Sequence, residues 1–183
     1  CSFQENPTIE ISYSLPTSMY EIPIVFDSVG NEYATDFTLN YYLKNELIEY
    51  MTEKGYECVD YGTGYDENGE IIKCDYPNKG REVGEAVVRK DVDYGVLMCG
   101  TGIGISVAAN KVPGVIAAVC SEPYSAKLTK QHNNANVIAF GARVVGVELA
   151  KMILDEFFGA EFEGGRHQAR VDMIHGIEAD YSK

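Results

Sequence analysis

The residues best placed to do chemistry stand in the segment Cys99-Gly100-Thr101-Gly102-Ile103-Gly104, which follows an apolar run and opens a helical pattern. Its three glycines let the backbone turn tightly and expose successive N–H groups, an arrangement that binds anionic oxygen atoms. Glycine-rich turns also occur between ordinary strands and helices. The segment by itself therefore indicates an anion site without deciding the function.

The same glycines leave a nucleotide site open as a minor alternative. Their spacing is G-x-G-x-G rather than G-x-G-x-x-G, because Ile105 and Val107 occupy the places that a third glycine would need. Glu122 follows the next apolar run, about where a ribose-binding acid would stand. No Gly-Lys-Ser/Thr sequence follows, so this is not a Walker loop. A nucleotide-dependent oxidoreductase remains the lesser reading.

Further polar candidates lie downstream. His132 and Asn133 close a helical pattern, where an imidazole could act as an acid or base near neutral pH or simply cap the helix. Arg166 and Arg170 are four residues apart, so both guanidinium groups lie on one face at the start of a helix, which suits phosphate. Arg143 is a third candidate. A solvated face is the alternative, but a cationic pair stands out in a chain of net charge −13.

The elements that must position these residues alternate between strand-like and helical patterns. The predicted strands are Ile22–Asp27, Tyr56–Gly62, Tyr94–Cys99, Val115–Cys120 and Val137–Phe140. Continuous Val- and Ile-rich runs, each followed by a helix, predict an α/β fold with a mainly parallel five-stranded sheet and helices on both faces. Ligands bind beyond the carboxyl ends of such strands, so we expect the chemistry just after Cys99, Cys120 and Phe140.

The helical patterns fill the gaps between these runs. One contains Leu43, Leu47 and Met51, with Gly55 as its C-terminal cap. The other predicted helices are Gly80–Arg89, Gly104–Ala109, Glu122–Gln131, Val147–Phe158 and His167–Tyr181. Residues 1–21 depart from this rhythm, because apolar and polar residues alternate there as in an edge strand. We expect an N-terminal extension over 1–21 and a single domain over 22–183.

Composition excludes several classes of protein. The 183 residues suit one domain, and 45% hydrophobic residues can supply a sizeable core. Lys+Arg 15 against Asp+Glu 28 argues against nucleic-acid and anionic-membrane partners, because both need a basic face. No apolar run approaches the roughly 20 residues of a membrane span.

The cysteines bear on the compartment. There are five, widely spaced and without C-x-x-C, which predicts neither a zinc site nor a disulfide scaffold and favours a reducing, cytoplasmic compartment. The chain begins with Cys1. Trimming of a longer chain and processing at a lipoprotein-type cysteine are both open as explanations of that start.

Three stretches together closely resemble one known family. They are CGTGIGISVAANKVPGVIAAVCSEPYSAKL, QHNNANVIAFGARVVG and FEGGRHQARVDMI. In this order and spacing they are similar to the type B ribose-5-phosphate isomerases and the galactose-6-phosphate isomerase subunits, from about Tyr42 to Ile174. The resemblance implies a Rossmann-like three-layer sandwich, a sugar-phosphate substrate and no metal or organic cofactor. It also implies a homodimer or dimer of dimers with active sites shared across the dimer interface.

The resemblance assigns roles to the candidate residues. Cys99 would be the base that moves a proton between C1 and C2 of the open sugar phosphate. Thr101 and the backbone amides of Gly100–Gly104 would steady the enediolate oxygens. His132 would open the furanose ring, with Asn133 holding a hydroxyl group.

The phosphate and the pocket wall take the remaining assignments of the resemblance. Arg166 and Arg170 would hold the phosphate, joined by Arg143 from the neighbouring subunit. Tyr76, in Asp75-Tyr76-Pro77, matches a pocket residue of the family.

The first βα loop departs from the family pattern of Ser/Cys-Asp-His-Ala-Gly. The nearest match is Asp27-Ser28-Val29-Gly30, so Asp27 stays a candidate substrate ligand and Ser28 replaces the histidine. Residues from about 34 to 41 resemble an insertion, and His167 could compensate in part for the lost imidazole. A sugar-phosphate-binding relative with reduced or altered activity is therefore the second reading. Whether the sugar is a pentose or a hexose stays open.

Overall fold

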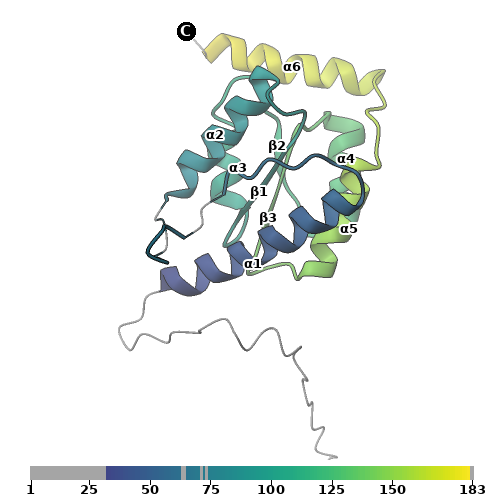
Figure 1. Cartoon of the computed structure of the whole chain (residues 1–183). Helices are drawn as coiled ribbons and strands as arrows, with labels where there is room; N and C mark the ends of the chain where they lie inside the picture. The colour runs from purple at the N-terminus through teal and green to yellow at the C-terminus, as the bar shows by residue number, and fades with distance from the viewer. Residues whose placement is uncertain (1–31, 63–64, 71, 73, 182–183) are drawn as a thin grey trace, which may run out of the picture. The chain divides into compact units, whose positions relative to one another are not determined.

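The structure, a computed structural model, describes residues 32–62, 65–70, 72 and 74–181. Their elements follow in the order α1 (Glu32–Glu53), α2 (Tyr76–Arg89), β1 (Gly95–Cys99), α3 (Ile103–Ala109), β2 (Ala117–Val119), α4 (Pro123–Asn133), β3 (Val137–Gly141), α5 (Val147–Phe158) and α6 (Arg166–Tyr181) (Figure 1). The predicted extension over 1–21, the predicted strand Ile22–Asp27 and the candidate ligand Asp27 lie outside the described residues.

The sheet is parallel, with β3 between β1 and β2. Its register pairs Gly95 with Val137 and Cys99 with Gly141, so β1 and β3 end next to each other. All five residues of β3 are buried, as the central strand of a sheet covered on both faces requires. The predicted α/β fold with a parallel sheet is confirmed.

The predicted strand Tyr56–Gly62 does not form, and the predicted strand Ile22–Asp27 lies outside the described residues, so the described sheet contains three of the five predicted strands. Tyr56 and Val59 are 41% and 57% exposed, and the segment bonds locally instead: Asp60 accepts a hydrogen bond from the Gly62 amide and pairs with Lys44 at 2.7 Å. A strand is stabilised by pairing its backbone with a neighbour. Among the described residues, nothing pairs with the edge of β1 that faces away from β3.

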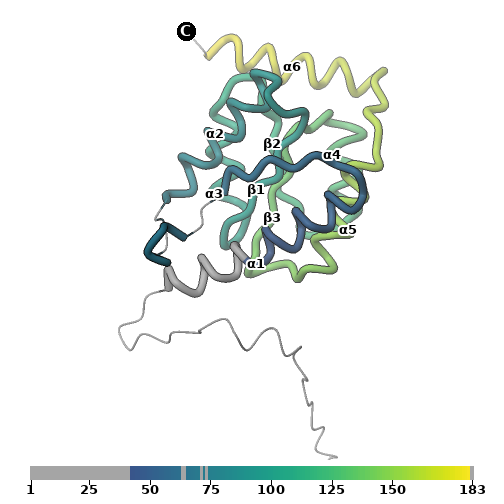
Figure 2. The backbone as a smooth tube through the Cα atoms, viewed as in Figure 1, coloured from purple at the N-terminus to yellow at the C-terminus, as the bar shows by residue number. Residues whose placement is uncertain are grey.

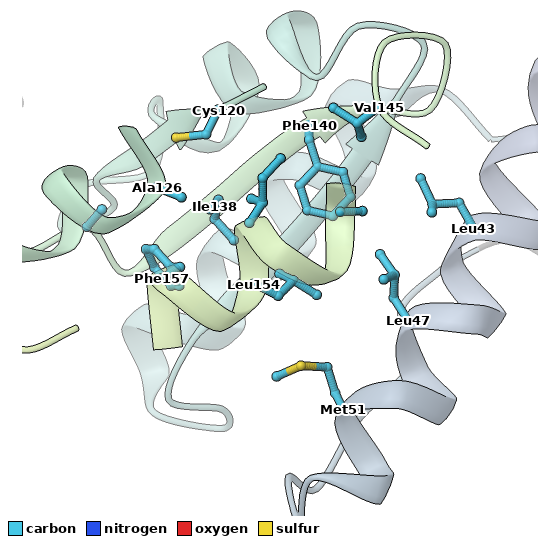
Figure 3. Close-up of a cluster of buried hydrophobic side chains, with 13 residues drawn as sticks. Leu43, Leu47, Met51, Cys120, Ala126, Ile138, Phe140, Val145, Leu154 and Phe157 are labelled. Atoms are coloured by element: carbon cyan, nitrogen blue, oxygen red, sulfur yellow. The ribbon is translucent and has the colours of Figure 1, made fainter. Parts of the chain in front are cut away.

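Helices cover both faces of the sheet because the side chains of β3 alternate. Ile138 and Phe140 join a cluster with α1, α4 and α5 (Figure 3), whereas Val137 and Ala139 join a second cluster with α2 and α3. The first cluster contains Leu43, Leu47, Met51, Cys120, Ala126, Ala135, Ile138, Phe140, Val145, Ala150, Ile153, Leu154 and Phe157. Burying apolar surface on both faces fixes the strand ends that carry the candidate site.

Local sequence features determine where α2 and α4 begin. Helix α2 begins at Tyr76, four residues before the predicted start, because Pro77 occupies its first turn, where proline is well tolerated. Glu122 accepts hydrogen bonds from the Tyr124 and Ser125 amides at 2.6 and 2.8 Å and so caps α4.

Helix α6 stands apart from the others in its burial. Of its sixteen residues only His167 and Val171 are buried, and Met173, Ile174 and Ile177 are 69%, 44% and 62% exposed. The backbone trace in Figure 2 shows α6 running across the end of the unit, beyond α2 and α4. None of the described helices has the length and apolar character that crossing a membrane would need.

Candidate active site

The first part of the site is the turn that connects β1 to α3. The Gly102 amide donates a hydrogen bond to the Sγ atom of Cys99 at 3.2 Å, which fixes the position of the sulfur. Gly102 takes a left-handed conformation, with φ 78°, that glycine adopts without strain. The Ile103 amide donates to Thr101 Oγ1 at 3.4 Å. The turn thus holds a half-buried thiol next to an exposed threonine.

Two side chains lie directly against this turn. A Cβ atom at Gly104 would stand 2.7 Å from Cε2 of Tyr76, and one at Gly100 would stand 2.8 Å from Nε of Arg143. The Arg143 amide also donates to the Gly100 carbonyl at 3.1 Å. The glycines therefore leave room for a phenol ring and a guanidinium group. We call Cys99, residues 100–104, Tyr76 and Arg143 the carboxyl-end cluster.

The second part of the site is formed by the end of α4 and the start of α6. The rings of His132 and His167 stack with centroids 4.2 Å apart and an interplanar angle of 3°. Oε2 of Glu163 lies 3.9 Å from Nε2 of His132 and 3.6 Å from Nε2 of His167. Arg166 and Arg170 lie with His167 in the first turns of α6. We call His132, Asn133, Glu163, Arg166, His167 and Arg170 the amino-end cluster.

The surroundings of His167 disfavour its protonated form. Burial lowers the pKa of His167 first, the neighbouring His132 and the Arg166 guanidinium lower it further, and the Glu163 carboxylate opposes them. Arg166 Nε donates a hydrogen bond to Nε2 of His167 at 3.3 Å. Since Nε2 accepts this bond, the proton of neutral His167 resides on Nδ1.

The two clusters lie at opposite ends of the sheet. The carboxyl-end cluster follows the last residues of β1 and β3, whereas α4 returns alongside the sheet and ends at Asn133, before β3 begins. Four residue steps of β3 alone span about 13 Å. Figure 1 shows α6 at one end of the sheet and the start of α5 at the other.

This separation divides the predicted site residues between the two clusters. Within one chain the structure brings Cys99, Thr101, Tyr76 and Arg143 together, but it does not bring His132 near Cys99. Arg143 is likewise remote from Arg166 and Arg170, an arrangement that fits the expectation that it joins them from a neighbouring subunit.

Glu163 is a member of the site that the sequence did not predict. It stands far along the chain from His132, but its amide donates to the Gln131 carbonyl at 3.0 Å, which ties the segment to the end of α4. Gly164 and Gly165, both with positive φ (63° and 55°), then turn the chain into α6. The two consecutive glycines are the sequence feature that could have indicated a sharp turn of the chain just after Glu163.

Three side chains of metal-binding type meet here, although the sequence predicted no metal cluster. One ligand atom each from His132, Glu163 and His167 lies within 4.8 Å of the others. The parallel rings direct their nitrogen lone pairs alongside each other rather than toward one point, and Arg166 already donates to His167 Nε2. This geometry suits proton handling better than tetrahedral ligation of an ion.

Comparison with known proteins shows the family of the chain. The family model described as ribose/galactose isomerase matches residues 37–174. The chain belongs to this family. It is 53% identical over 140 residues to ribose-5-phosphate isomerase B of Escherichia coli strain K12, which covers 76% of this chain and 91% of that protein.

Solved structures of the family have the same fold. Ribose-5-phosphate isomerase B of Clostridium thermocellum is 48% identical, with a TM-score of 0.74 over 80% of this chain and 95% of that one. The enzyme of Mycoplasma genitalium, solved with bound ribulose-5-phosphate, is 40% identical, with a TM-score of 0.71 over 79% of this chain and 93% of that one.

Proposed function

We propose that this protein is an aldose–ketose isomerase that interconverts ribose 5-phosphate and ribulose 5-phosphate. The observation that carries the proposal is the half-buried Cys99 thiol, whose sulfur accepts a hydrogen bond from Gly102 inside a turn of exposed amides. Membership of the ribose/galactose isomerase family supports the same chemistry. Both carboxylate oxygens of Glu122 accept hydrogen bonds at the start of α4. This capping role explains Glu122 without a nucleotide, so the hypothesis of a nucleotide-dependent oxidoreductase is the less supported one.

In this mechanism Cys99 acts as the base. Its thiolate removes the proton from C2 of the open-chain aldose, and the carbonyl electrons move to O1 to give an enediolate. Thr101 and the amides of the turn stabilise the negative oxygens, and such donors contribute about 3 kcal/mol each in comparable sites. The proton of the O2 hydroxyl passes to O1, the electrons left on O2 form the C2 carbonyl, and the sulfur returns its proton to C1, which gives the ketose.

Substrate capture uses the amino-end cluster. Arg166 and Arg170 lie one turn apart at the start of α6, where two guanidinium groups can share one phosphate. His132 opens the furanose ring by moving a proton at the ring oxygen, and Asn133 holds a hydroxyl group. A dianionic substrate in a chain of net charge −13 needs this local concentration of positive charge.

A complete site needs two copies of the chain. A five-carbon sugar phosphate is too short to touch both clusters of one chain, since β3 alone separates them by about 13 Å. A two-fold dimer that sets the amino-end cluster of each copy against the carboxyl-end cluster of the other would form two equal sites. We therefore propose a homodimer with shared sites as the active unit, with a dimer of dimers as an extension of it.

Exposed apolar side chains support this dimer. Near the glycine turn Ile103 and Val107 are 56% and 53% exposed, and Tyr124 is 69% exposed at the start of α4. On α6 Met173 and Ile177 are 69% and 62% exposed. Exposed apolar side chains on the elements that carry the two clusters are typical of surfaces that a partner covers.

The test is a turnover panel with EDTA present, comparing ribose 5-phosphate, a hexose 6-phosphate and free ribose. We expect turnover to be fastest on ribose 5-phosphate, with little on free ribose. Binding of ribose 5-phosphate without turnover of any sugar would support the altered relative instead. A thermal shift with NAD would revive the oxidoreductase reading.

A further inference from the structure

The stacked pair of imidazoles contains a residue that the proposed mechanism does not use. His167 is only 5% exposed, and its ring lies parallel to that of His132 at a centroid distance of 4.2 Å. Glu163 is likewise unused, yet its Oε2 faces the Nε2 atoms of both rings. A buried ring and a carboxylate around one proposed acid–base group form the arrangement that orients such groups in enzymes.

We propose that His167 and Glu163 are positioning residues for His132, an inference that rests on the proposed ring opening by His132. His167 fixes the plane of the His132 ring. Glu163 holds Nε2 as the nitrogen of that ring that carries the proton.

The burial of His167 gives it the rigidity that a support needs. His132 is accessible at the end of α4, with a side chain 34% exposed, whereas the side chain of His167 is 7% exposed. The His167 amide donates to the Gly164 carbonyl at 3.0 Å, and Arg166 Nε donates to the His167 ring at 3.3 Å. The buried ring is therefore held from both its backbone and its edge, and it limits rotation of the ring stacked on it.

The hydrogen bond from Arg166 decides which imidazole Glu163 serves. Nε2 of His167 accepts that bond, so it has no proton to give to the carboxylate. The nearby Nε2 of His132 is 3.9 Å from Glu163, which is within ion-pair distance and longer than a hydrogen bond. Such catalytic contacts are often long before substrate binds. The carboxylate therefore favours a proton on Nε2 of His132.

The charges around the pair are consistent with this division of roles. Arg166 and Arg170 on α6 disfavour a proton on His167, and His132 on α4 does the same. Glu163, in the segment before α6, is the acidic group that opposes them. Its carboxylate faces His132 as well as His167.

The kinetic test compares His167→Ala, His167→Phe, Glu163→Gln and Glu161→Gln on two substrates, ribose 5-phosphate and a four-carbon aldose 4-phosphate that cannot form a furanose. His167→Ala should lower kcat on ribose 5-phosphate about ten-fold, with KM changed less than about two-fold. His167→Phe keeps a flat ring and should restore most of that loss. The kcat on the four-carbon substrate should fall much less in these variants, because this substrate has no ring to open.

The matched control for the carboxylate is Glu161, which is exposed on the same segment two residues before Glu163. Glu163→Gln should lower kcat on ribose 5-phosphate about five-fold, and Glu161→Gln should leave it unchanged. Equal loss in His167→Phe and His167→Ala would overturn the role of the ring plane. Equal behaviour of Glu163→Gln and Glu161→Gln would overturn the role of the carboxylate.

A titration without substrate separates this inference from the proposed function. NMR of the imidazole ring protons follows the pH at which the stacked pair takes up its first proton. Glu163→Gln should move that midpoint down by about half a pH unit or more, since an opposite charge favours the protonated form, whereas Glu161→Gln should not. A shifted midpoint in a protein without isomerase activity would contradict the proposed function alone. An unshifted midpoint in an active enzyme would overturn the positioning by Glu163.

Discussion

The guanidinium group of Arg143 occupies the space that a side chain at Gly100 would need. A Cβ atom on Gly100 would stand 2.8 Å from Nε and 2.9 Å from Cζ of Arg143, and the two residues are also joined by the hydrogen bond from the Arg143 amide to the Gly100 carbonyl. The turn after β1 and the turn after β3 are therefore fitted to each other. Glycine at position 100 lets Arg143 lie over the Cys99 turn.

Gly100→Ala should weaken substrate binding while leaving the fold intact. The added methyl group meets the end of a flexible side chain, so Arg143 is displaced and the backbone is not. We expect KM for ribose 5-phosphate to rise about ten-fold, with the free energy of unfolding changed by less than about 0.5 kcal/mol. The control is Gly146→Ala, where a Cβ atom meets nothing within 4 Å. Equal KM values in the two variants would show that Arg143 does not contact the substrate.

Cys99→Ala should remove the base without removing the binding site. We expect kcat to fall by orders of magnitude while the dissociation constant for ribose 5-phosphate changes little. Steady-state turnover and calorimetric binding measure the two effects separately. Turnover near that of the unaltered protein would refute the role of Cys99.

Replacing Arg166 and Arg170 together by Met should abolish discrimination between ribose 5-phosphate and free ribose. Met retains an unbranched side chain and removes the charge, and each charge-assisted hydrogen bond contributes about 1.5–3 kcal/mol. The measurement is the ratio of kcat/KM for the phosphorylated sugar over that for the free sugar. An unchanged ratio in the double variant would place the phosphate elsewhere.

The stability of the protein should fall in mild acid because of His167. Burial lowers the pKa of His167 below its ordinary value of about 6.5. Below that pH the unfolded chain takes up a proton that the folded protein resists, so the free energy of unfolding decreases as pH falls. Urea denaturation at pH 7.5 and 5.5 should show a larger loss for the unaltered protein than for His167→Phe. Parallel losses would mean that His167 protonates as easily in the folded state.

Much of the fold follows from local sequence, because apolar runs and helical periodicity are local signals. The start of β1 differs from its prediction by one residue, and α5 agrees at both ends. Tyr56–Gly62 is rich in strand-forming residues, but strand formation depends on a neighbour that the segment does not itself encode. Glu163 was missed for the same reason, since only the tertiary fold brings it to His132.

The separation of the two clusters could have been predicted. A helix that connects parallel strands runs back toward their amino ends, so the last residues of α4 must lie away from the last residue of β1. His132 closes α4 and Cys99 closes β1. The chain order therefore already implied that these two residues of one chain do not share a site.

Mixing two inactive variants tests the shared site most directly. One variant carries Cys99→Ala and the other carries Arg166→Met with Arg170→Met, and the two are coexpressed and compared with each alone. Random pairing makes half of the dimers mixed, and each mixed dimer has one intact site of two, so activity should recover to about a quarter of that of the unaltered protein. If the coexpressed variants are no more active than the sum of the two variants expressed alone, the shared site is contradicted. The two clusters would then have to act within one chain.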